Sequence, residues 1–219
     1  MEQVSNKQLV EYLKNHRSDG LQGLQRWKRI YRPMICPFDN LMNLIPERQR
    51  VLDIGCGIGT FLQLVAEYRA PLCLGGIEVD QSLIETSRAV LHQLSSCIPN
   101  RLEAYNGIDL PTWIEDYNYV LLIDVLHHIP RSQHEGFLSK LLAQMKSDTI
   151  VIIKDIDARQ PFWCLFNKMH DLVFSRQFTH ERGASEFQVS LEQLGYKVLK
   201  VMMQRVYVYP HFTIVCKKV

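Results

Sequence analysis

The chain has 219 residues, of which 47% are apolar and 22% are charged, and its formal net charge is +2. These values are typical of one ordinary globular domain with additions, and they exclude a largely disordered, collagen-like or disulfide-stapled chain. A net charge so close to zero also argues against a protein whose main partner is a nucleic acid.

The six cysteines are scattered, with no C-x-x-C pair and no histidine at zinc-ligand spacing, so free thiols are expected. No segment reaches the roughly 18–20 apolar residues that a membrane-spanning helix needs. The first residues also lack the apolar core of a signal peptide. These features predict a protein without a transmembrane segment, located in the reducing cytoplasm.

Two short helices are predicted before residue 47, and a third short apolar stripe follows them. Apolar residues recur at helical spacing between 5 and 16, between 21 and 30, and between 38 and 45. We expect Pro33 and Pro37 to interrupt any continuous helix between the second and third. Residues 1–47 are therefore interpreted as an N-terminal helical cover, and residues 48–219 as the main domain.

From about residue 48, short apolar runs alternate with helical patterns. The predicted strands are residues 50–55, 71–79, 101–105, 119–125 and 149–156, and the predicted helices are 61–68, 82–94 and 132–145. Strands and helices that alternate in this way predict an α/β fold with a parallel sheet.

After the fifth strand the pattern changes. An aromatic-rich insert at about 158–182 precedes a helix over 185–194 and two apolar runs, 196–203 and 206–217. The two runs are close enough in sequence to form an antiparallel pair. Core packing explains most of the aromatic residues in the insert, and a cover over an apolar ligand is the alternative.

The most informative segment is VLDIGCGIGTF, which runs from an apolar strand through three glycines into a helix. Glycines at the first strand-to-helix turn of an α/β sheet let the backbone approach a ligand. The spacing of Gly55, Gly57 and Gly59 differs from the G-x-G-x-x-G of dinucleotide sites, and Asp53 lies two positions before the first glycine. A carboxylate in this turn opposes a pyrophosphate. It favours a cationic ligand such as S-adenosylmethionine, which carries an ammonium and a sulfonium.

Two further strand ends supply polar side chains. Glu78 ends the second predicted strand, where a carboxylate can accept hydrogen bonds from both ribose hydroxyls, and Val79 follows it. Asn106 and Gly107 follow the third strand. We expect Asn106 to read the adenine amino group, with Asp109 as the alternative.

At these residues the chain resembles the class I S-adenosylmethionine-dependent methyltransferases, through the motifs VLDIGCGIGTF, GIEVD, NGIDLP and YVLLIDVLHHIP. The resemblance implies a Rossmann-like, seven-stranded, mostly parallel sheet with helices on both faces, an antiparallel last strand, and cofactor across the ends of strands one to four. Glu78 and Asn106 stand where the family more often has aspartate. The residues expected to bind the cofactor are Asp53, Gly55, Cys56, Gly57, Gly59, Glu78, Val79, Asn106, Gly107 and Asp124.

The fourth strand is followed by Asp124, His127 and His128. Asp124 either caps the next turn or lines the methionine end of the cofactor. A histidine here has a pKa suited to taking a proton from a methyl acceptor. The alternative is that this turn packs under the next helix. Because adjacent side chains usually point apart, we expect at most one of the two histidines to be catalytic.

The predicted activity is the in-line transfer of a methyl group from S-adenosylmethionine to a small-molecule or lipid-like acceptor. A non-catalytic binding or regulatory module of the same fold is the first alternative, and a nicotinamide-dependent oxidoreductase is the second. Asp155 and Asp157 could bind a hydroxylated acceptor or a metal, but two carboxylates alone make a poor metal site. They are therefore interpreted as a solvated strand end, and no metal is predicted. Tyr31 and Arg32 form a solvated helix face or contact the cofactor carboxylate or an anionic acceptor, and the sequence leaves both readings open.

Overall fold

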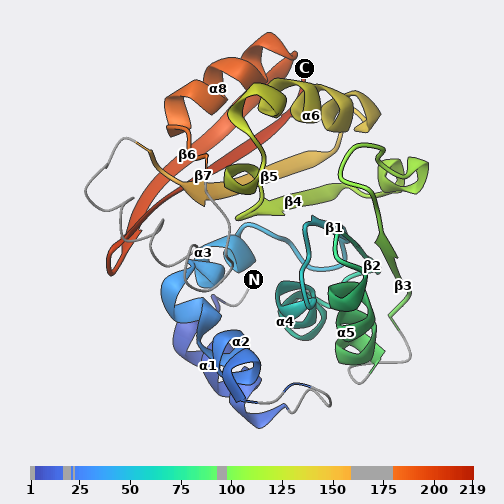
Figure 1. Ribbon diagram of the computed structural model, residues 1–219, viewed down its shortest axis with the longest axis vertical. Coiled ribbons are helices and arrows are strands. Elements are labelled where there is room, and N and C mark those ends of the chain that lie inside the picture. Colours follow the sequence, from blue (N-terminus) through green and yellow to red (C-terminus); the bar gives the residue numbers. More distant parts are fainter. Residues whose placement is uncertain (1–2, 17–20, 22, 93–97, 159–179) are drawn as a thin grey trace. The chain divides into compact units, whose positions relative to one another are not determined.

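The computed structural model describes residues 3–16, 21, 23–92, 98–158 and 180–219. The chain forms two compact units, Met1–Gly107 and Ile108–Val219, and the strands follow the order β3-β2-β1-β4-β5-β7-β6 (Figure 1). This is the seven-stranded Rossmann-like sheet that the sequence predicted. Among the described residues, no helix combines the length and the hydropathy needed to cross a bilayer. The insert predicted at about 158–182 lies largely outside the described residues.

The first unit begins with three helices, α1 (Asn6–Asn15), α2 (Gly23–Ile35) and α3 (Phe38–Asn43). The first two are the predicted helices, and the third lies in the predicted apolar stripe. A capping box starts α1, in which the Gln8 backbone N–H donates to the Ser5 hydroxyl and the Ser5 N–H donates to the Gln8 side chain. These two bonds satisfy donors that a helix start otherwise leaves unpaired. The division into a cover over residues 1–47 and a domain over 48–219 stays a prediction.

The predicted interruption between the second and third helices is confirmed at Pro37, which lies between α2 and α3. It is wrong at Pro33, because α2 continues through Pro33 to Ile35. A proline inside a helix lacks one N–H donor and crowds the carbonyl four residues earlier, at a cost of about 3 kcal/mol. Burial of Ile30 and Pro33, together with hydrogen bonds made by the buried Arg29 side chain, offsets this cost. Packing therefore overrides the local propensity.

Three parallel strands form the sheet of the first unit: β1 (Arg50–Ile54), β2 (Cys73–Glu78) and β3 (Asn100–Ala104). The helices α4 (Thr60–Arg69) and α5 (Gln81–His92) follow β1 and β2. In the register, Ile54 lies opposite Ile77 and Glu78 lies opposite Ala104. The carboxyl ends of the three strands consequently meet at one edge, where ligands bind in sheets of this kind.

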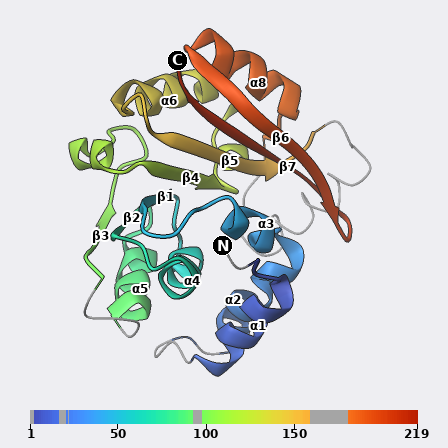
Figure 2. The same ribbon diagram turned by 180° about the vertical axis from the view of Figure 1, so that it is seen from behind.

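The described residues of the second unit form four strands, two α-helices and two short 3-10 helices. They are β4 (Tyr119–Ile123), α6 (Arg131–Gln144), β5 (Ile150–Ile156), α8 (Ala184–Gln193), β6 (Tyr196–Val206) and β7 (Tyr209–Lys218), with single 3-10 turns η1 (Thr112–Asp116) and η2 (Leu126–His128). β4 and β5 are parallel, whereas β7 runs antiparallel to both β5 and β6. The predicted antiparallel last strand is confirmed. In both views, α6 and α8 lie side by side over these strands (Figure 2).

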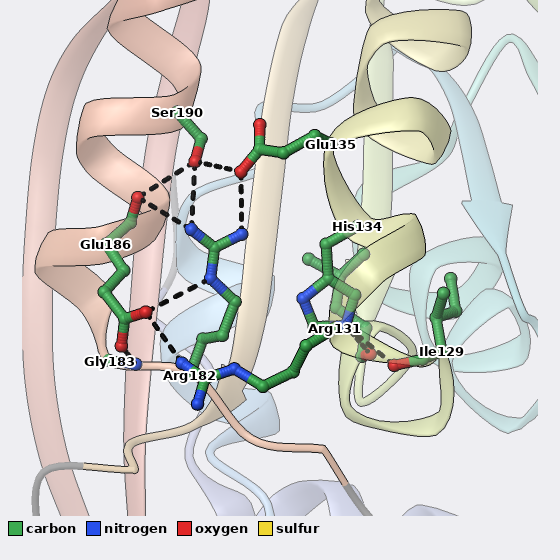
Figure 3. Close-up of polar contacts among 9 residues, drawn as sticks. Ile129, Arg131, His134, Glu135, Arg182, Gly183, Glu186 and Ser190 are labelled. Atoms are coloured by element: carbon green, nitrogen blue, oxygen red, sulfur yellow. Dashed lines mark hydrogen bonds and ion pairs between the residues drawn. The ribbon is translucent and has the colours of Figure 1, made fainter.

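A polar network joins α8 to α6 through Arg182, which precedes α8 (Figure 3). Its guanidinium donates to Glu135 at 2.9 Å and to the Ser190 hydroxyl at 3.1 Å, and it pairs with Glu186 at 3.5 Å. The same guanidinium lies over the Phe187 ring, 4.7 Å from its centroid. Because the Arg182 side chain is only 12% exposed, this network fixes the start of α8 against α6.

Candidate functional site

The turn after β1 has the open backbone that its glycines predicted. Gly57 and Gly59 have φ of 53° and 74°, in the left-handed region that favours glycine. A Cβ on Gly59 would lie 2.3 Å from the Ser87 hydroxyl oxygen, whereas a Cβ on Gly57 would meet nothing within 4 Å. Gly59 is therefore needed for packing against α5, while Gly57 faces open space. No signal in the sequence pointed to Ser87, because its contact depends on how α5 packs.

Glu78 links this turn to the end of β2. Its Oε2 accepts a hydrogen bond from the Gly57 N–H at 3.0 Å, and its Oε1 accepts from the N–H groups of Val79 at 2.7 Å and Asp80 at 3.4 Å. A carboxylate has about four acceptor positions. Glu78 can therefore hold the turn and still accept a hydrogen bond from a ligand hydroxyl.

Asp53 lies under the same turn and is nearly inaccessible, at 3% exposure. Its Oδ1 has no hydrogen-bond partner in the part of the chain that the structure describes. Burial, and then the negative charge of Glu78, raise the pKa of Asp53 well above its ordinary value, and the charge of Arg32 acts in the opposite direction. A buried carboxyl oxygen without a partner is costly, so this group is suited to a ligand that brings a positive charge or a donor.

Cys56 is part of the packing behind the turn. Its pKa is raised by burial and, to a smaller degree, by the charges of Asp53 and Glu78. A Cβ on Gly76 would approach the Cys56 sulfur to 2.8 Å, so β2 passes close behind it. The thiol is accordingly a neutral packing group and a poor nucleophile.

The segment after β3 lies beside the end of β2. The Tyr105 N–H donates to the Glu78 carbonyl at 3.0 Å, and a Cβ on Gly107 would lie 3.5 Å from the Val79 side chain. Asn106 and Val79 are both exposed. The structure thus gathers Val79, Asn106 and Gly107 at the edge that holds Glu78, and their role in binding a cofactor stays a prediction.

A second cluster lies at the ends of β4 and β5, within the other unit. The Asp124 carboxylate pairs with the fully buried ammonium of Lys154, and the Asp124 N–H donates to the Lys154 carbonyl at 2.9 Å. Asp124 has φ of 57°, which is uncommon for a residue other than glycine. This backbone strain and the buried pair set the path of the turn after β4.

Asp155 holds His127 in this cluster. One carboxylate oxygen contacts His127 Nδ1 and accepts from the Ile156 N–H at 2.7 Å, and the other accepts from the His127 N–H at 3.1 Å. Burial by itself raises the pKa of Asp155, but the charge of His127 and these hydrogen bonds outweigh it and hold the pKa below its ordinary value. His127 is 4% exposed, whereas the adjacent His128 is exposed, with its ring centroid 4.1 Å away.

The interpretation of Asp155 and Asp157 as a solvated strand end is wrong, because each is only 2% exposed. The cause is β7, which places Phe212 opposite Asp155 and accepts a hydrogen bond from the Asp157 N–H at the Pro210 carbonyl, 2.8 Å away. Nothing close to Asp155 in the sequence signals this cover.

Asp124, His127 and Asp155 also present ligand atoms within 4.8 Å of one another, the separation expected around a metal ion. Here the same atoms form two internal pairs, Asp124 with Lys154 and His127 with Asp155. A metal ion would have to displace a buried ammonium from one carboxylate and an imidazole from the other. The donor set therefore fits two hydrogen-bonded pairs better than a cation site.

Comparison with known proteins agrees with this fold. The methyltransferase-domain family matches residues 26–201. A magnesium protoporphyrin IX methyltransferase from Synechocystis, solved with S-adenosylhomocysteine, is 14% identical with a TM-score of 0.70 over 96% of this chain and 93% of that one. An S-adenosylmethionine-dependent methyltransferase from Aquifex aeolicus is 15% identical with a TM-score of 0.65, over 96% and 98%.

A mycolic acid cyclopropane synthase solved with S-adenosylhomocysteine is 12% identical with a TM-score of 0.63, over 82% of this chain and 83% of that one. No sequence among the curated proteins matches the chain. The family match spans most of the chain, including both units and the glycine turn. The chain therefore belongs to the methyltransferase-domain family, and its fold is that of the S-adenosylmethionine-dependent methyltransferases.

Proposed function

We propose that this methyltransferase binds S-adenosylmethionine at the turn after β1 and transfers its methyl group to a small-molecule or lipid-like acceptor. The observation that carries the proposal is the buried carboxyl oxygen of Asp53, which has no partner among the described residues and lies under a turn whose Gly57 faces open space. The α-ammonium of the donor would supply the missing hydrogen bond and positive charge.

The remaining proposed contacts follow from the strand ends. Glu78 would accept hydrogen bonds from the ribose hydroxyls, and Asn106 would bind the adenine amino group beside Val79 and Gly107. Gly55, Cys56 and Gly59 would contribute backbone along the turn. Asp124 stays in the proposed cofactor set on the resemblance alone, because its carboxylate is paired with Lys154.

The transfer itself is a displacement at the methyl carbon. A lone pair of the acceptor forms the new bond to the methyl group as the carbon–sulfur bond breaks, and the electron pair stays on sulfur to give S-adenosylhomocysteine. The protein has to align the three atoms and exclude water, which is mostly a matter of positioning.

A hydroxyl acceptor also has to lose a proton, and we propose a histidine after β4 as the base. The pairing of His127 Nδ1 with Asp155 favours His127 over His128, because a carboxylate at Nδ1 fixes the tautomer and stabilises the imidazolium that forms. A base at this position raises the rate of such a step by about 10² to 10⁴.

The acceptor class is supported by charge and by analogy. A net charge of +2 gives little overall attraction for a polyanion. Two structures of similar fold are described as acting on a porphyrin and as a mycolic acid cyclopropane synthase. We also propose that the protein works in the cytoplasm, since the buried thiols of Cys56 and Cys216 are free.

Calorimetric titration with S-adenosylhomocysteine tests the proposal. We expect the wild-type protein to bind it and Asp53→Asn to bind it about 10- to 100-fold more weakly, the usual effect of losing a hydrogen bond to a charged group. Glu85→Gln is the matched control, because it removes one carboxylate from an exposed position of α5 in the same unit. Its affinity should equal that of the wild type.

Thermal unfolding without ligand separates a binding defect from a folding defect. Asp53→Asn should be at least as stable as the wild type at pH 7 to 8, because it replaces a carboxyl whose pKa is raised by burial and by Glu78. Such a group adds stability at low pH that is lost as the pH rises through its raised pKa. Affinity of the wild type for NADH, with none for S-adenosylhomocysteine, would refute the proposed function.

A further inference from the structure

The last part of α2 is held at the start of α4, the helix that follows the glycine turn. The Arg29 guanidinium donates to the side-chain oxygen of Gln63 and to the Leu13 carbonyl at 3.3 Å. Farther along the chain, the ring centroids of Phe38 and Phe61 lie 4.9 Å apart. Phe61 and Gln63 both belong to the first turn of α4, so two contacts fasten residues 29–38 beside the turn.

Arg32 lies between these two contacts, three positions after Arg29. Residues three apart on a helix occupy neighbouring positions on one face. Its side chain is half-buried. The pKa of Asp53 is raised by burial and by Glu78, and Arg32 supplies the opposing effect, which is what a cation close to that carboxyl produces.

The amino-acid end of S-adenosylmethionine carries an ammonium and a carboxylate on one carbon. A site that offers only Asp53 and Glu78 would suit the ammonium and repel the carboxylate. A guanidinium is well shaped to bind a carboxylate through two parallel hydrogen bonds.

We propose that Arg32 binds the carboxylate of the donor's methionine moiety while Asp53 receives its ammonium. This inference rests on the proposed function and deepens it, because it makes α2 part of the cofactor site. It also decides between the two readings of Arg32 that the sequence left open. The first unit then contains partners for both charges of the zwitterion, and it selects adenosyl thioethers that carry a complete amino acid.

Two ligands that differ only in the carboxylate provide the test. They are S-adenosylhomocysteine and its decarboxylated analogue, which keeps the amine. We expect Arg32→Met to weaken the binding of S-adenosylhomocysteine about 10- to 100-fold. Its affinity for the decarboxylated analogue should stay within about twofold of the wild-type value. Arg32→Lys keeps the positive charge but lacks the planar guanidinium. Its affinity for S-adenosylhomocysteine should lie between those of Arg32→Met and the wild type.

Two further variants complete the design. Arg26→Met removes an exposed cation from the same helix and should leave both affinities unchanged. Asp53→Asn should weaken the binding of both ligands by similar factors, because both carry the amine.

The outcomes separate the two claims. If the wild-type protein binds neither ligand, the proposed function fails. If it binds both and Arg32→Met lowers the affinity for each by the same factor, Arg32 acts through the fold or through long-range electrostatics. That result overturns the inference. Unchanged binding of S-adenosylhomocysteine by Arg32→Met also overturns it. A selective loss for the carboxylate-bearing ligand supports it, and such selectivity does not arise from misfolding.

Discussion

Two glycines of the turn after β1 serve different purposes, which composition alone does not reveal. Gly57 leaves its side of the turn open, while Gly59 lets α4 begin against Ser87 of α5. Asp53 shows the same contrast between stability and function. Its buried oxygen, which has no partner among the described residues, destabilises the ligand-free protein. A bound cation would remove this destabilisation.

Replacing Gly59 by alanine should lower the free energy of unfolding by about 1–3 kcal/mol, because the residue keeps a φ of 74° that alanine tolerates poorly. The new methyl group would also meet the Ser87 hydroxyl. Urea denaturation measures the change.

Gly136 is the control for this substitution. It lies at an exposed position inside α6, where a Cβ would meet nothing within 4 Å. Gly136→Ala should therefore raise the free energy of unfolding by about 0.5–1 kcal/mol. Equal effects at both positions would show that the turn does not need glycine at 59.

At the scale of single elements, α8 is docked by a side chain that precedes it. Arg182 reaches Glu135 of α6 and Ser190 of α8, so one guanidinium ties together elements that are about 50 residues apart in the chain. The guanidinium itself is mostly shielded from water, at 12% exposure, although the Glu135 side chain is 54% exposed. Its hydrogen bonds should therefore contribute more to stability than those of a fully exposed ion pair.

Arg182→Met should lower the free energy of unfolding by about 1–3 kcal/mol, because it leaves the Glu135 carboxylate and the Ser190 hydroxyl without this donor. Arg131→Met is the matched control, since Arg131 pairs with Glu186 at 2.7 Å but is 53% exposed. It should cost no more than about 1 kcal/mol. Urea denaturation of both variants checks this, and a smaller cost for Arg182→Met than for Arg131→Met would contradict it.

At the scale of the whole molecule, buried charge makes stability depend on pH. The pKa of Asp155 lies below its ordinary value because the charge of His127 and the hydrogen bonds from His127 and Ile156 overcome the effect of burial. A carboxyl of this kind contributes its full stability above the pKa it has in the unfolded chain. That contribution is lost as the pH falls through its lower, folded-state pKa.

Asp155→Asn should therefore be strongly destabilised near neutral pH, by about 3–5 kcal/mol, because one partner of a buried pair is removed. The difference from the wild type should persist down to about pH 4 and shrink below it. Chemical denaturation at a series of pH values measures it.

Asp116→Asn, in an exposed pair with Lys146 at 3.6 Å, is the control and should change the free energy of unfolding by less than about 1 kcal/mol. If the difference in the free energy of unfolding between the wild type and Asp155→Asn grew toward low pH, the lowered pKa of Asp155 would be refuted.

The sequence by itself determined the order and type of the main helices and strands, and it singled out the strand ends that are proposed as the cofactor site. Alternating apolar runs and helical patterns predicted the parallel sheet, and the spacing of the glycines with Asp53 and Glu78 predicted one edge of it as the binding site. These features could be read because periodicity and turn chemistry act over only a few residues. The ends of adjacent parallel strands then meet by topology alone.

Only the tertiary structure decided which charges are buried and which side chains meet. β7 pairs with β5 more than 50 residues later in the chain, packing carries α2 through Pro33, and the contacts of Arg29 and Phe38 hold this part of the chain against the start of α4. Burial and pairing of this kind depend on segments far apart in the chain. Their contributions to the free energy therefore exist only once the fold has brought those segments together.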